Sequence, residues 1–161
     1  MRWRGWRAGL FWIVSRTATC AYRAFPFRGY LPGAIAIIRR GRQFVVIDRS
    51  DGFGLAFPGG VGRRGEDPAR TVLREVREET GLEIFSARLL FSFKDDSFYP
   101  AHTFVFAAEA GGQMRGSWEG AVTLASLDEL RTRIIRSQQS VVQWLEREQM
   151  ESPQVKDPGG G

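Results

Sequence analysis

Apolar residues recur at three- and four-residue intervals in the middle of the chain, which is the spacing of one helix face. Between residues 67 and 80 the members of this stripe are Ala69, Val72, Leu73, Val76 and Thr80. Asp67 is a natural N-cap, Pro68 suits the first helical position, and Gly81 can take the left-handed conformation that ends a helix. The pattern predicts a helix over roughly 67–80 whose stripe is buried.

Shorter apolar runs, separated by glycine, proline and aspartate, predict β-strands around this helix. We expect a hairpin formed by residues 34–39 and 44–48 and further strands over 55–57, 84–94 and 103–108. Residues 111–117 have the composition of a loop. The capping box from Ser126 to Glu129 predicts a helix that ends near Arg136, and a last helix is expected over about 138–150.

The two ends of the chain have different patterns. Residues 3–25 have the spacing of a basic amphipathic helix, and their longest apolar run, 8–14, is far below the ~20 residues that span a bilayer. This helix would pack on its own domain or on a second subunit, which we favour, or residues 1–25 would contact an anionic membrane peripherally. We therefore divide the chain into an N-terminal arm (1–30), one domain (31–151) and a disordered tail (152–161).

Composition changes this picture in two respects. The formal charge of +5 comes from the arm, which has six arginines and no acid and leaves 17 basic and 18 acidic residues elsewhere. No specific nucleic-acid partner is therefore expected. A single cysteine excludes an internal disulfide framework, so we expect a cytoplasmic protein, with membrane association only through the N-terminal helix.

Three glutamates crowd together on the predicted helix. Glu75, Glu78 and Glu79 fall within about a third of a turn of one another, so their charges repel. A bound cation would relieve this repulsion. Oxygen donors suit Mg²⁺ or Mn²⁺, whereas zinc prefers histidine or cysteine, of which the chain has only His102 and Cys20.

Residues 60–82, GVGRRGEDPARTVLREVREETGL, resemble the signature sequence of the Nudix hydrolase family. The matching positions are Gly60, Glu66, Arg74, Glu75, Val76, Glu78, Glu79, Gly81 and Leu82. The resemblance implies an α+β Nudix fold, in which a mixed β-sheet lies within an α/β/α sandwich, here with an extra N-terminal amphipathic helix. It also implies a hydrolase that acts on phosphoric anhydride bonds with Mg²⁺ or Mn²⁺ as cofactor.

The resemblance also assigns roles to residues. It implies that the metal ligands are Glu75, Glu78, Glu79 and the carbonyl of Gly59, with Glu119 as a further ligand. Either Glu78 or Glu119 would orient or deprotonate the attacking water. Arg74 would hold the glutamates in place, and Glu66 would be a loop anchor or an outer metal ligand.

The implied substrate is a nucleoside diphosphate linked to another group, such as ADP-ribose, a nucleotide-sugar or a dinucleoside polyphosphate. Alternatives are a (d)NTP pyrophosphatase, an RNA 5′ pyrophosphohydrolase or a nucleotide sensor without catalysis. Tyr99 stands 17 residues after Leu82, where members that act on diadenosine polyphosphates often carry a tyrosine. The candidate substrate contacts are Arg49, Lys94, Phe98 and Tyr99. A homodimer is left open.

Overall fold

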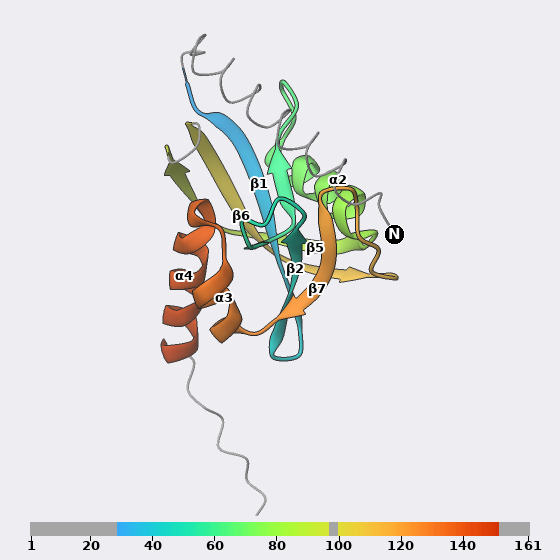
Figure 1. Ribbon diagram of the computed structural model, residues 1–161. Coiled ribbons are helices and arrows are strands. Elements are labelled where there is room, and N and C mark those ends of the chain that lie inside the picture. The colour runs from blue at the N-terminus through green and yellow to red at the C-terminus, as the bar shows by residue number, and fades with distance from the viewer. Residues whose placement is uncertain (1–28, 97–99, 152–161) are drawn as a thin grey trace, which may run out of the picture.

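The computed structural model describes residues 29–96 and 100–151 (Figure 1). Its strands are β1 (Leu31–Arg40), β2 (Gln43–Arg49), β3 (Leu55–Ala56), β4 (Gly59–Val61), β5 (Glu83–Asp95), β6 (Ala101–Gly111) and β7 (Gly120–Ala125). Its helices are α2 (Pro68–Thr80), α3 (Leu127–Arg133), the 3-10 helix η1 (Arg136–Gln138) and α4 (Gln139–Glu151). The N-terminal helix, Phe98, Tyr99 and the tail lie outside the described residues.

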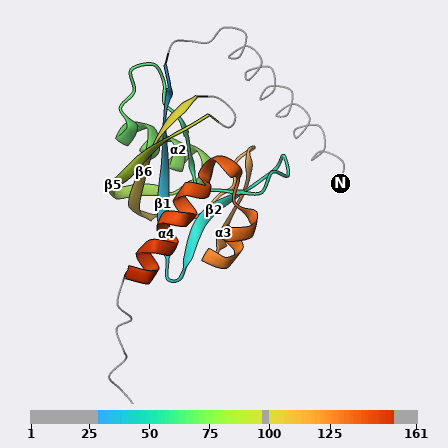
Figure 2. The same cartoon turned by 90° about the vertical axis from the view of Figure 1, so that its left-hand side faces the viewer.

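A mixed β-sheet forms the centre of the fold. Its strand order is β3-β2-β1-β6-β5, with β4 paired to β1 and β7 paired to β2. β1 runs parallel to β6 and antiparallel to β2 and β4. Figures 1 and 2 show α2 on one face of the sheet and α4 on the other. The expected mixed sheet within an α/β/α sandwich is therefore confirmed.

Two apolar clusters fill the space between these layers. On one face, Val72 and Val76 of α2 pack against Ala36 and Phe106. On the other, Val141 and Leu145 of α4 pack against Ile37. Alternate residues of β1 point to opposite faces, so one buried strand supplies both clusters. No helix in the described part of the chain is long and apolar enough to cross a membrane.

Most predicted elements are present, but four details differ. β4 and β7 were not expected as strands, and both exist because they pair with neighbours distant in sequence. Helix α3 ends at Arg133 rather than near Arg136. The reason is that the backbone of Ile134 is extended and forms an isolated β-bridge with Leu55. The prediction that Leu73 is buried is wrong. Its side chain is 42% exposed, and Thr71 and Glu79 are buried instead.

Candidate active site

The ends and the buried face of α2 fix how this helix presents its glutamates. The Asp67 side chain accepts a hydrogen bond from the Ala69 amide at 2.8 Å, and Gly81 ends the helix at φ 70°. Val72 and Val76 are fully buried against the sheet. Because this face cannot rotate away from the core, the adjacent face carrying Glu75 and Glu79 is directed toward β4.

At the turn into β4, whose first two residues are Gly59 and Gly60, the backbone approaches α2 closely. A Cβ atom at Gly59, which has φ 146°, would lie 2.1 Å from the Ala34 carbonyl oxygen, so only glycine fits there. A Cβ atom at Gly60 would lie 2.8 Å from Cδ of Glu75. The Gly59 amide donates a 2.7 Å hydrogen bond to Oε2 of Glu79. The two glycines thus bring the backbone against the carboxylates.

Arg74 links the acidic residues into a network. It donates to both oxygens of Glu66 at 3.0 and 2.8 Å, to Glu75 at 2.6 Å and to Glu78 at 3.3 Å. Glu66 also accepts from the Arg63 amide at 2.8 Å. Hydrogen bonds from Arg74 are the main reason that the pKa of Glu66 falls to about 2. This geometry suits the expected structural role of Arg74 and the loop-anchor alternative for Glu66.

Among the described residues, Glu79 is the only acid that is buried as a whole residue, at 8% exposure. Burial raises the pKa of Glu79 and, to a smaller extent, that of Glu75. The negative charge of Glu119 raises the pKa of both. These two side chains and Glu119 therefore share one site of concentrated negative charge.

Glu119 reaches this site because its loop is tied down at both ends. The Arg115 amide donates to the Thr80 carbonyl at 2.7 Å, which joins the loop to the C-terminal end of α2. The Ser50 amide donates to the Glu119 carbonyl at 2.9 Å, which joins it to the turn after β2. Two backbone contacts thus fix a residue that lies forty positions from Glu79.

The donors at this site fit a hard divalent cation by their chemistry. They are carboxylate and backbone oxygens, and a cation would relieve the repulsion that raises the pKa of Glu75 and Glu79. In residues 29–96 and 100–151, no three His, Cys, Asp or Glu side chains are already arranged as a complete ligand set. Glu78 is 53% exposed and interacts with Arg74 and Arg63, so it would have to turn inward to join Glu75 and Glu79.

Of the other predicted site residues, the structure describes Arg49 and Lys94, which contact residues other than the glutamates. Two hydrogen bonds, one of them 3.1 Å between Nε and Oδ1, hold Arg49 against Asp51. The Lys94 ammonium lies 4.7 Å from the ring centroid of Tyr30. The single histidine, His102, hydrogen-bonds to the Ser92 hydroxyl at 3.0 Å rather than to a glutamate. The roles of Arg49 and Lys94 in substrate binding therefore stay predictions.

One buried residue next to the site was not anticipated. The Gln138 side chain accepts a 2.7 Å hydrogen bond from the Phe57 amide, directly before the turn that contains Gly59. This contact connects η1 to the end of β3 and steadies the approach of the glycine turn. Because 81 residues separate the two partners, no local sequence signal identifies it.

Comparison with known proteins identifies the family and the fold. The model of the NUDIX domain matches residues 29–154, so the chain belongs to the Nudix family. It is a hydrolase of the class that acts on phosphoric anhydride bonds. Members of this family generally use divalent metal ions and act on nucleotide derivatives. No curated protein matches the chain significantly in sequence.

Solved structures share the fold. The E. coli ORF135 protein is 20% identical with a TM-score of 0.68, and the match covers 78% of this chain and 95% of that protein. The MutT Nudix hydrolase from Burkholderia pseudomallei is 22% identical with a TM-score of 0.65, covering 72% and 98%. A UDP-X diphosphatase is 22% identical with a TM-score of 0.64, covering 86% and 73%.

Proposed function

We propose that the protein is a Mg²⁺- or Mn²⁺-dependent pyrophosphohydrolase that cleaves nucleoside diphosphates linked to another group. The observation that carries this proposal is the gathering of Glu75, Glu79 and Glu119 beside the Gly59–Gly60 turn. Such a concentration of negative charge is unfavourable unless a cation is taken up. The name of the similar UDP-X diphosphatase supports the same substrate class.

Each residue of the site has a defined task in this proposal. Glu75, Glu78, Glu79, Glu119 and the Gly59 carbonyl would hold the cation. When bound, a divalent cation neutralises phosphate oxygens and lowers the pKa of a coordinated water. Arg74 keeps Glu75 oriented through their 2.6 Å contact, and the Gly59 amide does the same for Glu79.

The base that takes a proton from the attacking water is Glu78 or Glu119. The 53% exposed carboxylate of Glu78 is accessible to water. Glu119 lies at the end of its anchored loop, near enough to Glu75 and Glu79 for its charge to act on both. Positioning and proton acceptance are the only tasks required of the protein, because no covalent intermediate is needed.

The substrate would extend from this site toward the predicted contacts Arg49, Lys94, Phe98 and Tyr99. A panel of ADP-ribose, UDP-glucose, diadenosine tetraphosphate, nucleoside triphosphates and 5′-triphosphate RNA, assayed with Mg²⁺ and with Mn²⁺, separates the alternatives. We expect turnover of a linked nucleoside diphosphate. Faster turnover of the triphosphates or of RNA would instead make the protein a (d)NTP pyrophosphatase or an RNA 5′ pyrophosphohydrolase. Tight binding without turnover would indicate a sensor.

Glu78→Gln is the companion variant for this panel. It should lose several orders of magnitude in turnover, on the scale of a lost metal ligand or base, while its circular dichroism spectrum is unchanged. Near-normal turnover would contradict the assigned role. Glu83→Gln, at the exposed start of β5, is the matched control and should keep full activity.

We also propose that the protein is cytoplasmic and that residues 1–30, 31–151 and 152–161 are separate parts of the chain. Sedimentation with anionic liposomes tests membrane contact by residues 1–25, and comparing the full chain with a variant that lacks them isolates their contribution. Analytical ultracentrifugation of the full chain tests whether it forms a homodimer.

A further inference from the structure

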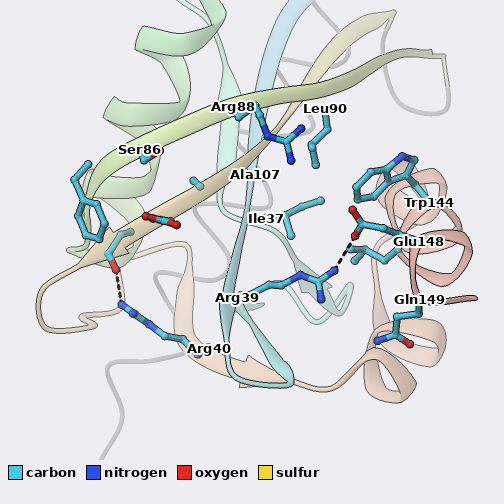
Figure 3. Close-up of a pocket in the computed structure, with 15 residues that line it drawn as sticks. Ile37, Arg39, Arg40, Ser86, Arg88, Leu90, Ala107, Trp144, Glu148 and Gln149 are labelled. Atoms are coloured by element: carbon cyan, nitrogen blue, oxygen red, sulfur yellow. Dashed lines mark hydrogen bonds and ion pairs between the residues drawn. The ribbon is translucent and has the colours of Figure 1, made fainter. Parts of the chain in front are cut away.

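A concave region lies on the face of the sheet opposite α2. It is a groove of about 880 Å³ whose floor is formed by β1, β5 and β6 and whose wall is α4 (Figure 3). The glutamate cluster, by which we mean Glu75, Glu78, Glu79 and Glu119 with the backbone of Gly59 and Gly60, contributes nothing to its lining. Its volume is within the range of pockets that take small organic ligands.

The groove exists because α4 covers only part of this face. Val141 and Leu145 pack α4 onto the β1 side of the sheet. Farther out, the strand register places Arg88 beside Ala107 and Ser86 beside Glu109. Because the side chains of Ala107 and Ser86 are small, they leave space above the sheet between α4 and the edge strand β5.

The charged groups of the groove are unequally compensated. Arg39 is paired with Glu148 at 2.9 Å, and Arg40 donates a 2.7 Å hydrogen bond to the Ala110 carbonyl. Arg88 makes neither an ion pair nor a hydrogen bond with any residue in the described ranges. Its strand partner Ala107 lies two residues from Glu109, so an acid is near but not paired with it. Figure 3 shows its side chain extending from β5 over the floor of the groove, toward Ile37. One guanidinium is therefore available to a ligand.

The wall beside this guanidinium is apolar and aromatic. Trp144 is half-buried, with its ring 5.3 Å from that of Phe91, and Leu90 lies next to it along the groove. An indole ring beside an apolar side chain offers a surface on which a planar ring can pack. A free guanidinium binds phosphate with two parallel hydrogen bonds.

We propose that this groove binds a nucleoside monophosphate, with its phosphate on Arg88 and its base against Trp144 and Leu90. The charge of the groove selects one phosphate. Arg39 and Glu148 neutralise each other, and the carboxylate of Glu109 would repel a polyphosphate or a nucleic-acid strand. This carboxylate can instead accept hydrogen bonds from ribose hydroxyls or from an exocyclic amino group. The binding site is separate from the reaction at the glutamates and does not depend on it.

Titration with AMP, monitored through the Trp144 indole N–H signal in ¹⁵N-edited NMR spectra, tests this assignment. The signal is assigned with Trp144→Phe, and EDTA is present throughout to exclude metal-dependent binding. We expect a saturable shift of this signal, and Arg88→Gln should weaken binding at least about tenfold, as expected when a charged hydrogen-bond partner is lost. Arg70→Gln, an exposed arginine on α2, is the matched control and should bind AMP normally.

Further titrations distinguish a nucleotide site in the groove from a simple anion site and from binding at the glutamates. Glu78→Gln should leave the AMP response unchanged, and loss of the response would place binding at the glutamates and overturn the proposal. Adenosine and inorganic phosphate should each bind at least about tenfold more weakly than AMP. Equal binding of phosphate alone would mean a simple anion site, and no Trp144 response to AMP, or a normal one in Arg88→Gln, would also overturn the assignment.

Discussion

The glutamate cluster and the groove are assembled in opposite ways. All but one residue of the cluster comes from positions 59–79, which form β4, a short loop and α2, and Glu119 alone comes from elsewhere. The groove takes residues from three strands and α4, spread from Ile37 to Gln149. The first region is therefore encoded locally, whereas the second exists only once strand register and helix packing are set.

Their electrostatics differ as well. In the cluster, carboxylates crowd together, and Arg74 contacts two of them, Glu75 and Glu78, as well as Glu66. The groove contains charges of both signs, of which Arg39 and Glu148 pair with each other and Arg88 is left without a partner among the described residues. Crowded like charges indicate a site for a strongly charged ion, whereas mixed charges suit an organic ligand that carries one phosphate.

The largest effect that tests this comparison is expected from Glu79→Gln. The variant keeps the size of the side chain and can still accept from the Gly59 amide, but it cannot take the negative charge with which a carboxylate binds a cation. We expect turnover to fall on the order of a thousandfold with little change in fold. Steady-state kinetics of the preferred substrate in Mg²⁺ measures this.

A glutamate on the other face provides the control for that experiment. Glu146 of α4 pairs with Arg131 and lies in neither the cluster nor the groove lining. Glu146→Gln should retain turnover within about twofold, as expected of a surface ion pair. Equal losses in both variants would show that turnover reports general destabilisation rather than the cluster.

The next largest effect is expected from Gly60→Ala. The added methyl group would meet the Glu75 carboxylate at 2.8–3.1 Å, so that side chain must move. A displacement of this size can reduce turnover by roughly tenfold to a hundredfold. Gly33→Ala, whose added methyl would have only ordinary contacts at 3.4 Å, should cost much less. Similar turnover in the two variants would mean that the close approach at Gly60 is unimportant.

The sequence predicts the locally encoded features of the structure and misses those that depend on long-range contacts. Asp67, Pro68 and Gly81 are local signals, and the bounds of α2 agree with them to the residue. Strand β7 was missed because its partner β2 is more than seventy residues away and only pairing makes it a strand. Periodicity assigned Leu73 to the core, yet the approach of β4 buries Glu79 on the other edge of the stripe. The contact of Gln138 with Phe57 and the groove have no local signature at all.

A stability effect of intermediate size is expected from Arg74→Lys. Lysine keeps the charge but cannot contact Glu66 with two parallel hydrogen bonds while also reaching Glu75. Because the Arg74 side chain is only 18% exposed, the free energy of unfolding should fall by about 1–2 kcal/mol. Urea unfolding measures this, and Arg70→Lys on the exposed side of α2 should change it little. An unchanged unfolding midpoint would mean that the network does not stabilise the helix.

The smallest effect is expected from pH acting on Glu66. Its pKa lies near 2 in the folded protein, below the ordinary value of 4.5, chiefly because Arg74 donates hydrogen bonds to the ionised form. A lowered pKa stabilises the fold above pH 4.5, and this stabilisation is lost as the pH falls toward 2. Glu66→Gln should therefore have a lower melting temperature than the parent at pH 6, and the difference should shrink steadily below pH 4.5.

Glu83→Gln controls for general acid effects, because Glu83 is exposed and makes no ion pair with any described residue. Its melting temperature should follow that of the parent at every pH. A difference between Glu66→Gln and the parent that stays constant down to pH 3 would show that the contacts of Glu66 act through shape rather than charge. The cluster would then owe its rigidity to packing, as the groove does, and the electrostatic contrast between the two regions would be confined to Glu75, Glu79 and Glu119.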